Sequence, residues 1–151
     1  MNLLLVDDEA PALAKLRRFL ADEADVRVVG EAADGSAALA FVEAQPEAVD
    51  AVLLDIQMPG RSGLEIAAAL PAHVLVAFAT AYDEYAVQAF DLNAVDYLLK
   101  PYTRERLAAC VTRLRARLAT LHGDAAGVTL LREDGRTCVR VTLPARTQGA
   151  A

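Results

Sequence analysis

Polar residues follow four of the short apolar runs in this sequence, each at the point where the run ends. The residues are Asp7 and Asp8, Asp55, Thr80 and Lys100, which follow apolar runs at residues 3–6, 51–54 and 74–79 and a strand-like stretch at 95–99 that ends in Leu98 and Leu99. If these runs are parallel strands of one sheet, their carboxyl ends meet at one edge, where ligands bind in such sheets. A single acid at a strand end is most often a helix cap. Five polar residues on matching ends of four strands instead favour one shared site.

The chemistry of that site follows from its charges. Three converging carboxylates repel one another unless a cation lies between them. A hard divalent ion is the natural solution, and Mg²⁺ that retains several waters fits one or two direct carboxylate ligands. Lys100 adds a cation that binds an oxyanion, and Thr80 adds a hydroxyl donor. An aspartate in these surroundings is suited to nucleophilic attack on a phosphoryl group, because the ion and the lysine neutralise charge in the transition state.

The elements that must position these residues are five alternating pairs of strand and helix. Strands are predicted at residues 3–6, 26–30, 51–54, 74–79 and 95–99. Helices are predicted from Pro11, Gly35, Leu64 and Asp83, and most clearly from Leu107 to Leu121, where apolar residues recur at helical spacing. The pattern predicts a doubly wound, flavodoxin-like α/β fold, with a five-stranded parallel sheet in the order 2-1-3-4-5.

Composition excludes several classes of protein. The net charge of −6 argues against a basic nucleic-acid-binding surface on this chain. Cys110 and Cys138 lack metal-site or CxxC spacing, so we interpret them as free thiols in a reducing compartment. The sequence has no signal-like start and no apolar run near the roughly 18 residues that span a bilayer. We therefore expect a cytoplasmic protein without membrane contact.

The order of these motifs resembles that of CheY-like response-regulator receiver domains over about residues 1–121. The motifs are LLLVDDE, LLDIQMPGRSGLE, TAYDEYAVQAF and DYLLKP. The stretch from Thr80 to Ala86, with Phe90 and the residues from Asn93 to Pro101, is most similar to regulators of the LytR/AlgR class. Those regulators carry a LytTR DNA-binding domain after the receiver.

The resemblance implies a phosphoacceptor and a set of metal ligands. Asp55 would accept a phosphoryl group from a sensor histidine kinase. Asp8 and Asp55 would bind Mg²⁺ directly, Asp7 would act largely through water, and the backbone carbonyl of Gln57 would complete the protein ligands.

The resemblance also implies how the site signals. Thr80 and Lys100 would hold the phosphoryl oxygens, and Tyr97 would be the aromatic residue whose rotamer follows Thr80. The Lys100–Pro101 bond is expected to be cis. A population shift would rearrange the surface of the fourth helix, fifth strand and fifth helix, which would form a phosphorylation-dependent homodimer or release an output domain. Such a domain is not an enzyme in the usual sense, because it catalyses only its own phosphorylation and dephosphorylation.

We expect a receiver domain at residues 1–121 and a tail at residues 122–151. In the tail, residues 128–131 and 138–143 are β-rich around a turn signal at 133–135, which predicts a hairpin. A lone hairpin is marginal in water. It is either the truncated start of a LytTR domain, which we favour, or part of a stand-alone regulator, and DNA binding would then come only through the missing domain.

Two alternatives belong to other classes of protein. A phosphatase of the haloacid dehalogenase type also uses a strand-end aspartate and Mg²⁺. It normally has an acid two residues after the nucleophile, where this sequence has Gln57, and it has a cap insertion that is absent here. A degenerate receiver that serves only as an interaction module is the second alternative, but every residue of the acidic pocket is present.

Overall fold

The protein is described here from a computed structural model, which describes residues 1–126, 128–133 and 136–141, and the side chains of residues 1–121. The chain forms two compact units that divide after Arg115. The expected domain boundary at residue 121 stays a prediction. None of the described helices is long and apolar enough to cross a membrane.

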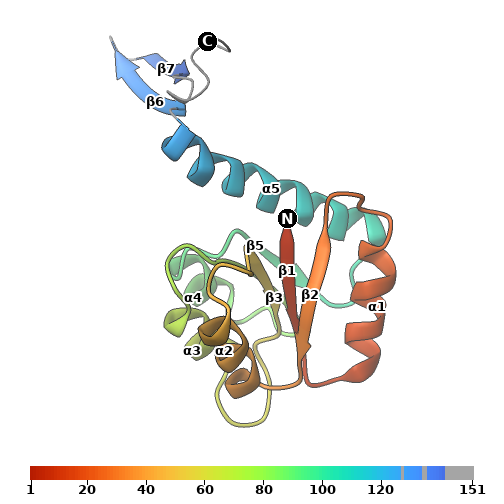
Figure 1. Ribbon diagram of the computed structural model, residues 1–151. Coiled ribbons are helices and arrows are strands. Elements are labelled where there is room, and N and C mark those ends of the chain that lie inside the picture. Colours follow the sequence, from red (N-terminus) through yellow and green to blue (C-terminus); the bar gives the residue numbers. More distant parts are fainter. Residues whose placement is uncertain (127, 134–135, 142–151) are drawn as a thin grey trace. The chain divides into compact units, whose positions relative to one another are not determined.

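The first unit is built on a five-stranded parallel sheet in the order β2-β1-β3-β4-β5, which confirms the predicted topology (Figure 1). The strands are β1 (Asn2–Val6), β2 (Arg27–Ala32), β3 (Ala51–Leu54), β4 (Leu75–Thr80) and β5 (Asp96–Leu99). Their register aligns the carboxyl ends: Val6 pairs with Leu54, and Thr80 pairs with Leu99. Asp7, Asp55 and Lys100 are each the next residue after such an aligned end.

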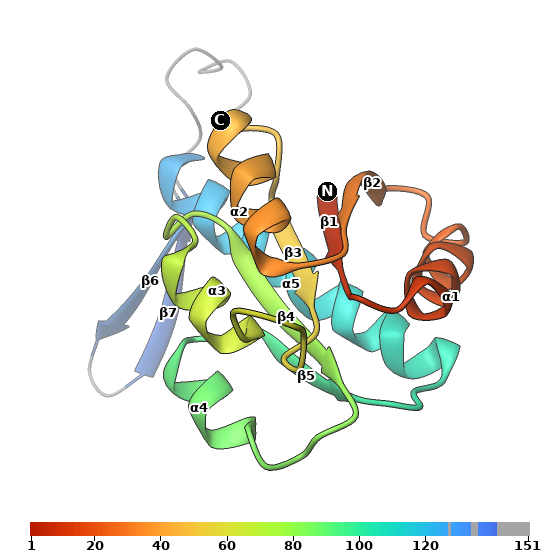
Figure 2. The same ribbon diagram turned by 90° about the horizontal axis from the view of Figure 1, so that it is seen from below.

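Helices cover both faces of this sheet. They are α1 (Ala10–Leu20), α2 (Gly35–Ala44), α3 (Gly63–Ala69), α4 (Ala86–Asp91) and α5 (Arg104–Ala126). Figure 2 shows α1 and the first half of α5 on one face, and α2, α3 and α4 on the other. The predicted start of α4 at Asp83 is wrong, because residues 83–85 form a bend and turn before the helix begins. Asn93, two residues after the end of α4, has a left-handed φ of 62°, which is common just after a helix.

The core follows from the alternation of side chains along each strand. Leu4 and Val6 of β1 belong to one buried cluster with Val42 of α2, Ile66 of α3 and Ala89 of α4. The neighbouring residues of β1 must then point to the opposite face. The apolar residues buried in β1, α1 and α5 on that side are Leu3, Leu5, Leu13, Leu16, Leu20, Leu107, Val111 and Leu114. Because both faces of the central strands are buried, β3 and β4 are apolar almost throughout, whereas the edge strand β2 carries the exposed Arg27 and Glu31.

The segment from Asp55 to Gly63 is held by an unusually close contact of its backbone. The amide of Gly63 donates a hydrogen bond to the carbonyl of Ile56 at 2.8 Å. A Cβ atom at Gly63 would lie 2.1 Å from the carbonyl oxygen of Asp55. A capping box between Ser62 and Glu65 fixes the first turn of α3 at this point. The start of α3 therefore sets the position of the Asp55 backbone.

A buried carboxylate attaches α5 to the beginning of β5. Both oxygens of Asp96 accept hydrogen bonds from Arg106, at 2.7 and 2.8 Å, and Arg113 donates to it at 2.8 Å. Burial alone would raise the pKa of Asp96, but hydrogen bonds from Arg106 and the Tyr97 amide, with the charges of both arginines, hold it below its ordinary value. Cys110 is a buried free thiol, as expected, and burial raises its pKa to about 12.

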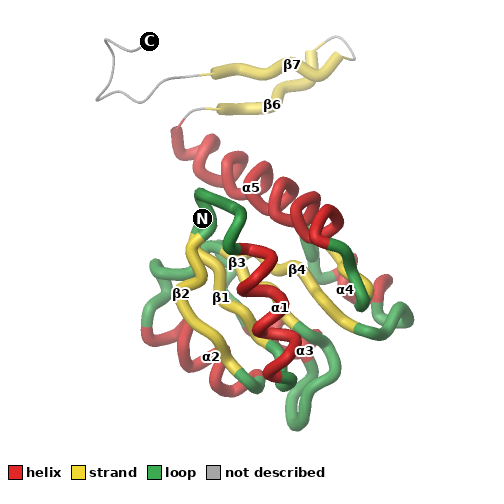
Figure 3. The backbone as a smooth tube through the Cα atoms, turned by 90° about the vertical axis from the view of Figure 1, so that its right-hand side faces the viewer, coloured by secondary structure: helices red, strands yellow, loops and turns green. Residues whose placement is uncertain are grey.

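The second unit contains an antiparallel hairpin of β6 (Val128–Glu133) and β7 (Arg136–Val141), in which Leu131 pairs with Cys138 (Figure 3). The sequence predicted this hairpin, although β6 is two residues longer than expected. Residues 134–135 of the predicted turn and residues 142–143 of the predicted second strand lie outside the described residues.

We predict that Gly63→Ala lowers the free energy of unfolding by about 2–4 kcal/mol, because the new methyl group meets backbone atoms that cannot rotate away. Urea unfolding measures this change. Ala68→Gly at an exposed position of α3 is the matched control, with an expected loss of about 1 kcal/mol. If Gly63→Ala is as stable as the wild type, the close contact with Asp55 does not constrain the fold.

We predict that Asp96→Asn lowers the free energy of unfolding at pH 7 by about 1–3 kcal/mol. The lower part of this range applies because the paired Arg106 and Arg113 side chains are 37% and 59% exposed. Since the pKa of Asp96 is lowered in the folded state, its contribution is present at neutral pH and is lost as the pH falls below the ordinary value of 3.8. Chemical unfolding between about pH 6 and pH 3 should therefore show a steeper loss for the wild type than for the variant. Parallel curves would contradict this assignment.

Candidate functional site

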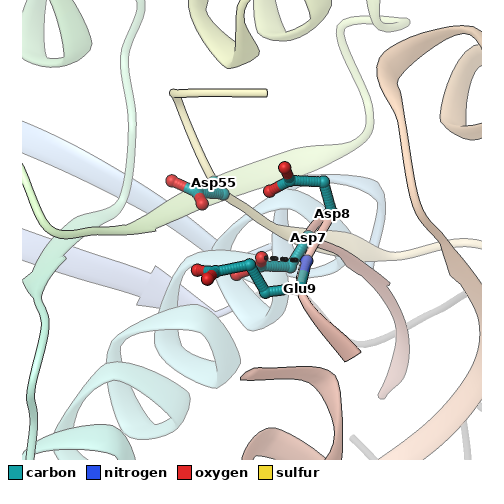
Figure 4. Close-up of side chains that lie close together, drawn as sticks. All are labelled: Asp7, Asp8, Glu9 and Asp55. Atoms are coloured by element: carbon teal, nitrogen blue, oxygen red, sulfur yellow. Dashed lines mark hydrogen bonds between the residues drawn. The ribbon is translucent and has the colours of Figure 1, made fainter. Parts of the chain in front are cut away.

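Acidic side chains converge at the carboxyl ends of β1 and β3. One carboxylate oxygen from each of Asp7, Asp8, Glu9 and Asp55 lies within 4.8 Å of the others. Figure 4 shows these side chains together, with the bond from the Glu9 amide to Asp7 Oδ1, which measures 2.9 Å. Asp7 and Asp55 are buried, and Asp8 and Glu9 are exposed. The convergence of Asp7, Asp8 and Asp55 predicted from the sequence is confirmed, and Glu9 is an addition to it.

Lys100 supplies a positive charge to this acidic cluster from the end of β5. Its Nζ donates to Asp7 Oδ2 at 2.7 Å and to Asp55 Oδ2 at 3.3 Å. Burial acts to lower the pKa of Lys100, but the two carboxylates outweigh it and raise the pKa above its ordinary value. The amine therefore stays charged. Burial raises the pKa of Asp55, and the nearby Asp7 adds to this, while Lys100 opposes both.

One oxygen of the Asp55 carboxylate accepts no hydrogen bond from the residues that the structure describes. Its Oδ1 atom is buried and has no hydrogen-bond partner among the described residues. A buried acceptor without a partner costs free energy, and such an atom in a native structure points to a ligand. The donor set here consists of carboxylate oxygens, which are the ligands that a hard divalent cation such as Mg²⁺ prefers. The residues present therefore fit such an ion.

A cavity of about 270 Å³ opens beside Asp55. Its lining residues are Asp8, Glu9, Asp55, Gln57, Ala81, Tyr82 and Lys100. Because a water molecule occupies about 30 Å³, this volume accommodates a small anion together with several waters. The cavity beside Asp55 is therefore large enough for a phosphoryl-sized group.

Thr80 and Tyr97 are both bonded to Tyr82 in the loop between β4 and α4. Thr80 is fully buried, and its Oγ1 accepts a hydrogen bond from the Tyr82 amide at 3.3 Å. Tyr97 donates its hydroxyl to the Tyr82 carbonyl and stacks at a tilt on Phe78. Thr80 is not among the residues that line the cavity. Its predicted contact with a phosphoryl oxygen requires its side chain or this loop to move.

The side chain of Gln57 makes a hydrogen bond to the loop between β4 and α4. Its Nε2 donates to the Tyr85 hydroxyl at 2.6 Å. The predicted role of the Gln57 carbonyl as a metal ligand stays a prediction. The Lys100–Pro101 bond is cis, as expected.

The sequence reasoning missed Glu9 and Tyr85. Glu9 directly follows two of the predicted ligands, so its place in the chain was a usable signal. The contact of Tyr85 with Gln57 spans 28 residues and two loops, and no spacing rule indicates it.

Comparison with known proteins identifies the family. The model of the response regulator receiver domain matches residues 3–112. The chain is 44% identical over 117 residues to an uncharacterized response regulatory protein of Yersinia pestis. It is 43% identical over 118 residues to the transcriptional regulatory protein BtsR of Escherichia coli strain K12. Both alignments cover 76% of this chain and 48% of the relative, so the chain spans about half the length of the curated relatives it matches.

Solved structures agree with this match. The response regulatory domain of mrkE from Klebsiella pneumoniae superposes with a TM-score of 0.72 at 32% identity, over 80% of this chain and 99% of that one. The REC domain of AraT from Geobacillus stearothermophilus superposes with a TM-score of 0.71 at 33% identity, over 80% and 97%. The chain therefore belongs to the response regulator receiver family, and residues 3–112 are the receiver domain of a two-component response regulator.

Proposed function

We propose that Asp55 accepts a phosphoryl group from a sensor histidine kinase in a reaction that requires Mg²⁺. The observation that carries this proposal is the buried Oδ1 of Asp55, which has no hydrogen-bond partner among the described residues, while Oδ2 of the same carboxylate accepts a hydrogen bond from Lys100. Membership of the receiver family favours this function over a phosphatase of the haloacid dehalogenase type.

In the proposed reaction, an Asp55 oxygen bonds to phosphorus while the bond from phosphorus to the kinase histidine nitrogen breaks. Asp8 and Asp55 would hold Mg²⁺ directly, Asp7 would contribute through water, and the Gln57 carbonyl would complete the protein ligands. Bound there, Mg²⁺ would act as a Lewis acid and neutralise charge on the phosphoryl oxygens.

Lys100 and Thr80 hold the product in this proposal. The Lys100 amine, which bridges Asp7 and Asp55, bonds a phosphoryl oxygen, and the Thr80 hydroxyl donates to another. Thr80 then gives up its bond with the Tyr82 amide, and Tyr97 follows the loop through its bond to the Tyr82 carbonyl. The domain acts only on its own phosphorylation and dephosphorylation.

The proposed output is a phosphorylation-dependent homodimer formed by the surface of α4, β5 and α5. Val87, Phe90 and Leu99 lie on α4 and β5, and they are 72%, 79% and 46% exposed. Large apolar side chains this exposed mark an interaction surface when they gather on adjacent elements. The movement of the β4–α4 loop at the start of α4 would connect this surface to the phosphorylation site.

Control of transcription would require a further domain. This chain spans about half the length of its curated relatives, and some of these relatives are named as transcriptional regulatory proteins. We propose that the hairpin of β6 and β7 is the beginning of a LytTR domain, and that DNA is contacted only through that domain. The likeness of residues 80–101 to the LytR/AlgR class supports this assignment.

Incubation with acetyl phosphate and Mg²⁺ tests the central proposal. We expect intact-mass spectrometry to show one added phosphoryl group on the wild type and none on Asp55→Asn, because only the carboxylate can act as the nucleophile. Omission of Mg²⁺ with a chelator should abolish labelling. An unlabelled wild type, or equal labelling of the variant, would sink the proposal and favour a receiver that serves only as an interaction module.

Phosphorylation is expected to raise the dimer fraction measured by size-exclusion chromatography with light scattering. Phe90→Gln should weaken the labelled dimer by about tenfold or more, because a large apolar contact is removed. It should still label at Asp55. Ala68→Gln, at an exposed position on α3, is the matched control. A labelled wild type that stays monomeric would rule out the dimer.

A further inference from the structure

The hydrogen bond between Gln57 and Tyr85 joins the two loops that border the cavity beside Asp55. Gln57 lies in the loop between β3 and α3, two residues after Asp55. Tyr85 lies at the end of the loop between β4 and α4. The bond is 2.6 Å long, with Gln57 Nε2 as donor and the Tyr85 hydroxyl as acceptor. It is the only side-chain bond of Gln57 among the residues whose side chains are described.

We propose that Tyr85 is a positioning residue that lengthens the lifetime of the phosphorylated state by holding the Gln57 amide at the mouth of the cavity. Tyr85 itself is not among the residues that line the cavity, whereas Gln57 is. Tyr85 therefore acts through Gln57. This inference rests on the proposed phosphorylation of Asp55.

The Tyr85 hydroxyl is a fixed anchor because its ring is held on two sides. The half-buried ring packs against the core cluster that contains residues of α2, α3 and α4. It also meets the ring of Tyr82 edge to face, with centroids 6.3 Å apart and an interplanar angle of 74°. Gln57 is exposed and has three rotatable side-chain bonds, so without this anchor its amide is free to leave the mouth.

The position of the Gln57 amide matters for hydrolysis of the phosphorylated site. In that step a water oxygen bonds to phosphorus, and the bond from phosphorus to the Asp55 oxygen breaks. The electron pair returns to the carboxylate, and the protons of the water leave with the phosphate. The water would reach Asp55 through the cavity whose lining includes Asp8, Glu9, Gln57 and Tyr82. A Gln57 amide that is held by Tyr85 narrows this path for water, and a Gln57 amide that is released widens it.

The hydrogen bond between Gln57 and Tyr85 also links the lifetime of the phosphorylated state to the position of the β4–α4 loop. That loop is bonded to β5 at Tyr82, through the hydroxyl of Tyr97. It is bonded to the β3–α3 loop at Tyr85, through Gln57. A displacement of the loop therefore moves the anchor of Gln57, independently of any contact made by Thr80.

The test compares Tyr85→Phe, Gln57→Ala and the double variant, each in the full chain. Each protein is labelled with acetyl phosphate and Mg²⁺ and then desalted, and loss of the phosphoryl mass is followed over time. Because one hydrogen bond is removed, each single variant should lose the label about 2–10-fold faster than the wild type. The double variant should be no faster than the faster single variant, because both changes remove one shared bond.

Tyr102→Phe is the matched control. It also removes one tyrosine hydroxyl, and this hydroxyl makes no hydrogen bond among the described side chains and does not line the cavity beside Asp55. Its phosphoryl lifetime should stay within about twofold of the wild type. Unfolding midpoints of all variants separate a general loss of structure from a local effect.

The outcomes are distinct. A labelled wild type with an unchanged lifetime in Tyr85→Phe overturns this inference and leaves the proposed function intact. Rate increases that multiply in the double variant also overturn it, because the two residues would then act separately. A wild type that never takes the label overturns the proposed function and this inference together.

Discussion

The structure depends on keeping several negative charges together at one edge of a sheet. Asp7 and Asp55 are buried from water, yet they lie within a few ångströms of Asp8 and Glu9. Lys100 bonds to the two buried carboxylates and so attaches the ends of β1, β3 and β5 to one another. Strand register and the close approach of Gly63 to Asp55 then fix where these charges stand. The single amine of Lys100 is therefore shared between two buried carboxylates.

Two buried aspartates differ in how far their surroundings satisfy the carboxylate. Asp96 receives two guanidinium groups and the Tyr97 amide, and its pKa is lowered. Asp55 shares one amine, retains an unpartnered oxygen, and has a raised pKa because burial dominates. Asp55 follows the carboxyl end of β3, whereas Asp96 begins β5, and β4 lies between these two strands in the sheet. A carboxylate whose oxygens all accept hydrogen bonds stabilises the fold. A carboxylate with an unbonded oxygen can still gain a favourable interaction when a ligand binds.

Much of this was predictable from the sequence, for a physical reason. Strands buried on both faces are largely apolar, so Asp7 and Asp55 were conspicuous as the first polar residues after such strands, and Lys100 as the charged residue after Leu98 and Leu99. The predicted strand order alone placed these three residues at one edge of the sheet, so their side-chain contacts did not have to be known in advance. The start of α4 was less predictable, because Asp83 to Tyr85 fold as a bend and turn although their spacing suits a helix. The bond from Gln57 to Tyr85 was not predictable, because it depends on the conformations of two loops.

The bond between Lys100 and Asp7 joins residues 93 positions apart in the chain. Such a contact contributes nothing until the intervening sheet has formed, since closing a long loop costs entropy that only native packing returns. During synthesis on the ribosome, the carboxylates of β1 and β3 would therefore emerge well before the amine that balances them. A nascent chain that stops short of β5 has the acidic residues but not their counter-charge. Competence to receive a signal and completion of the sheet are then the same event.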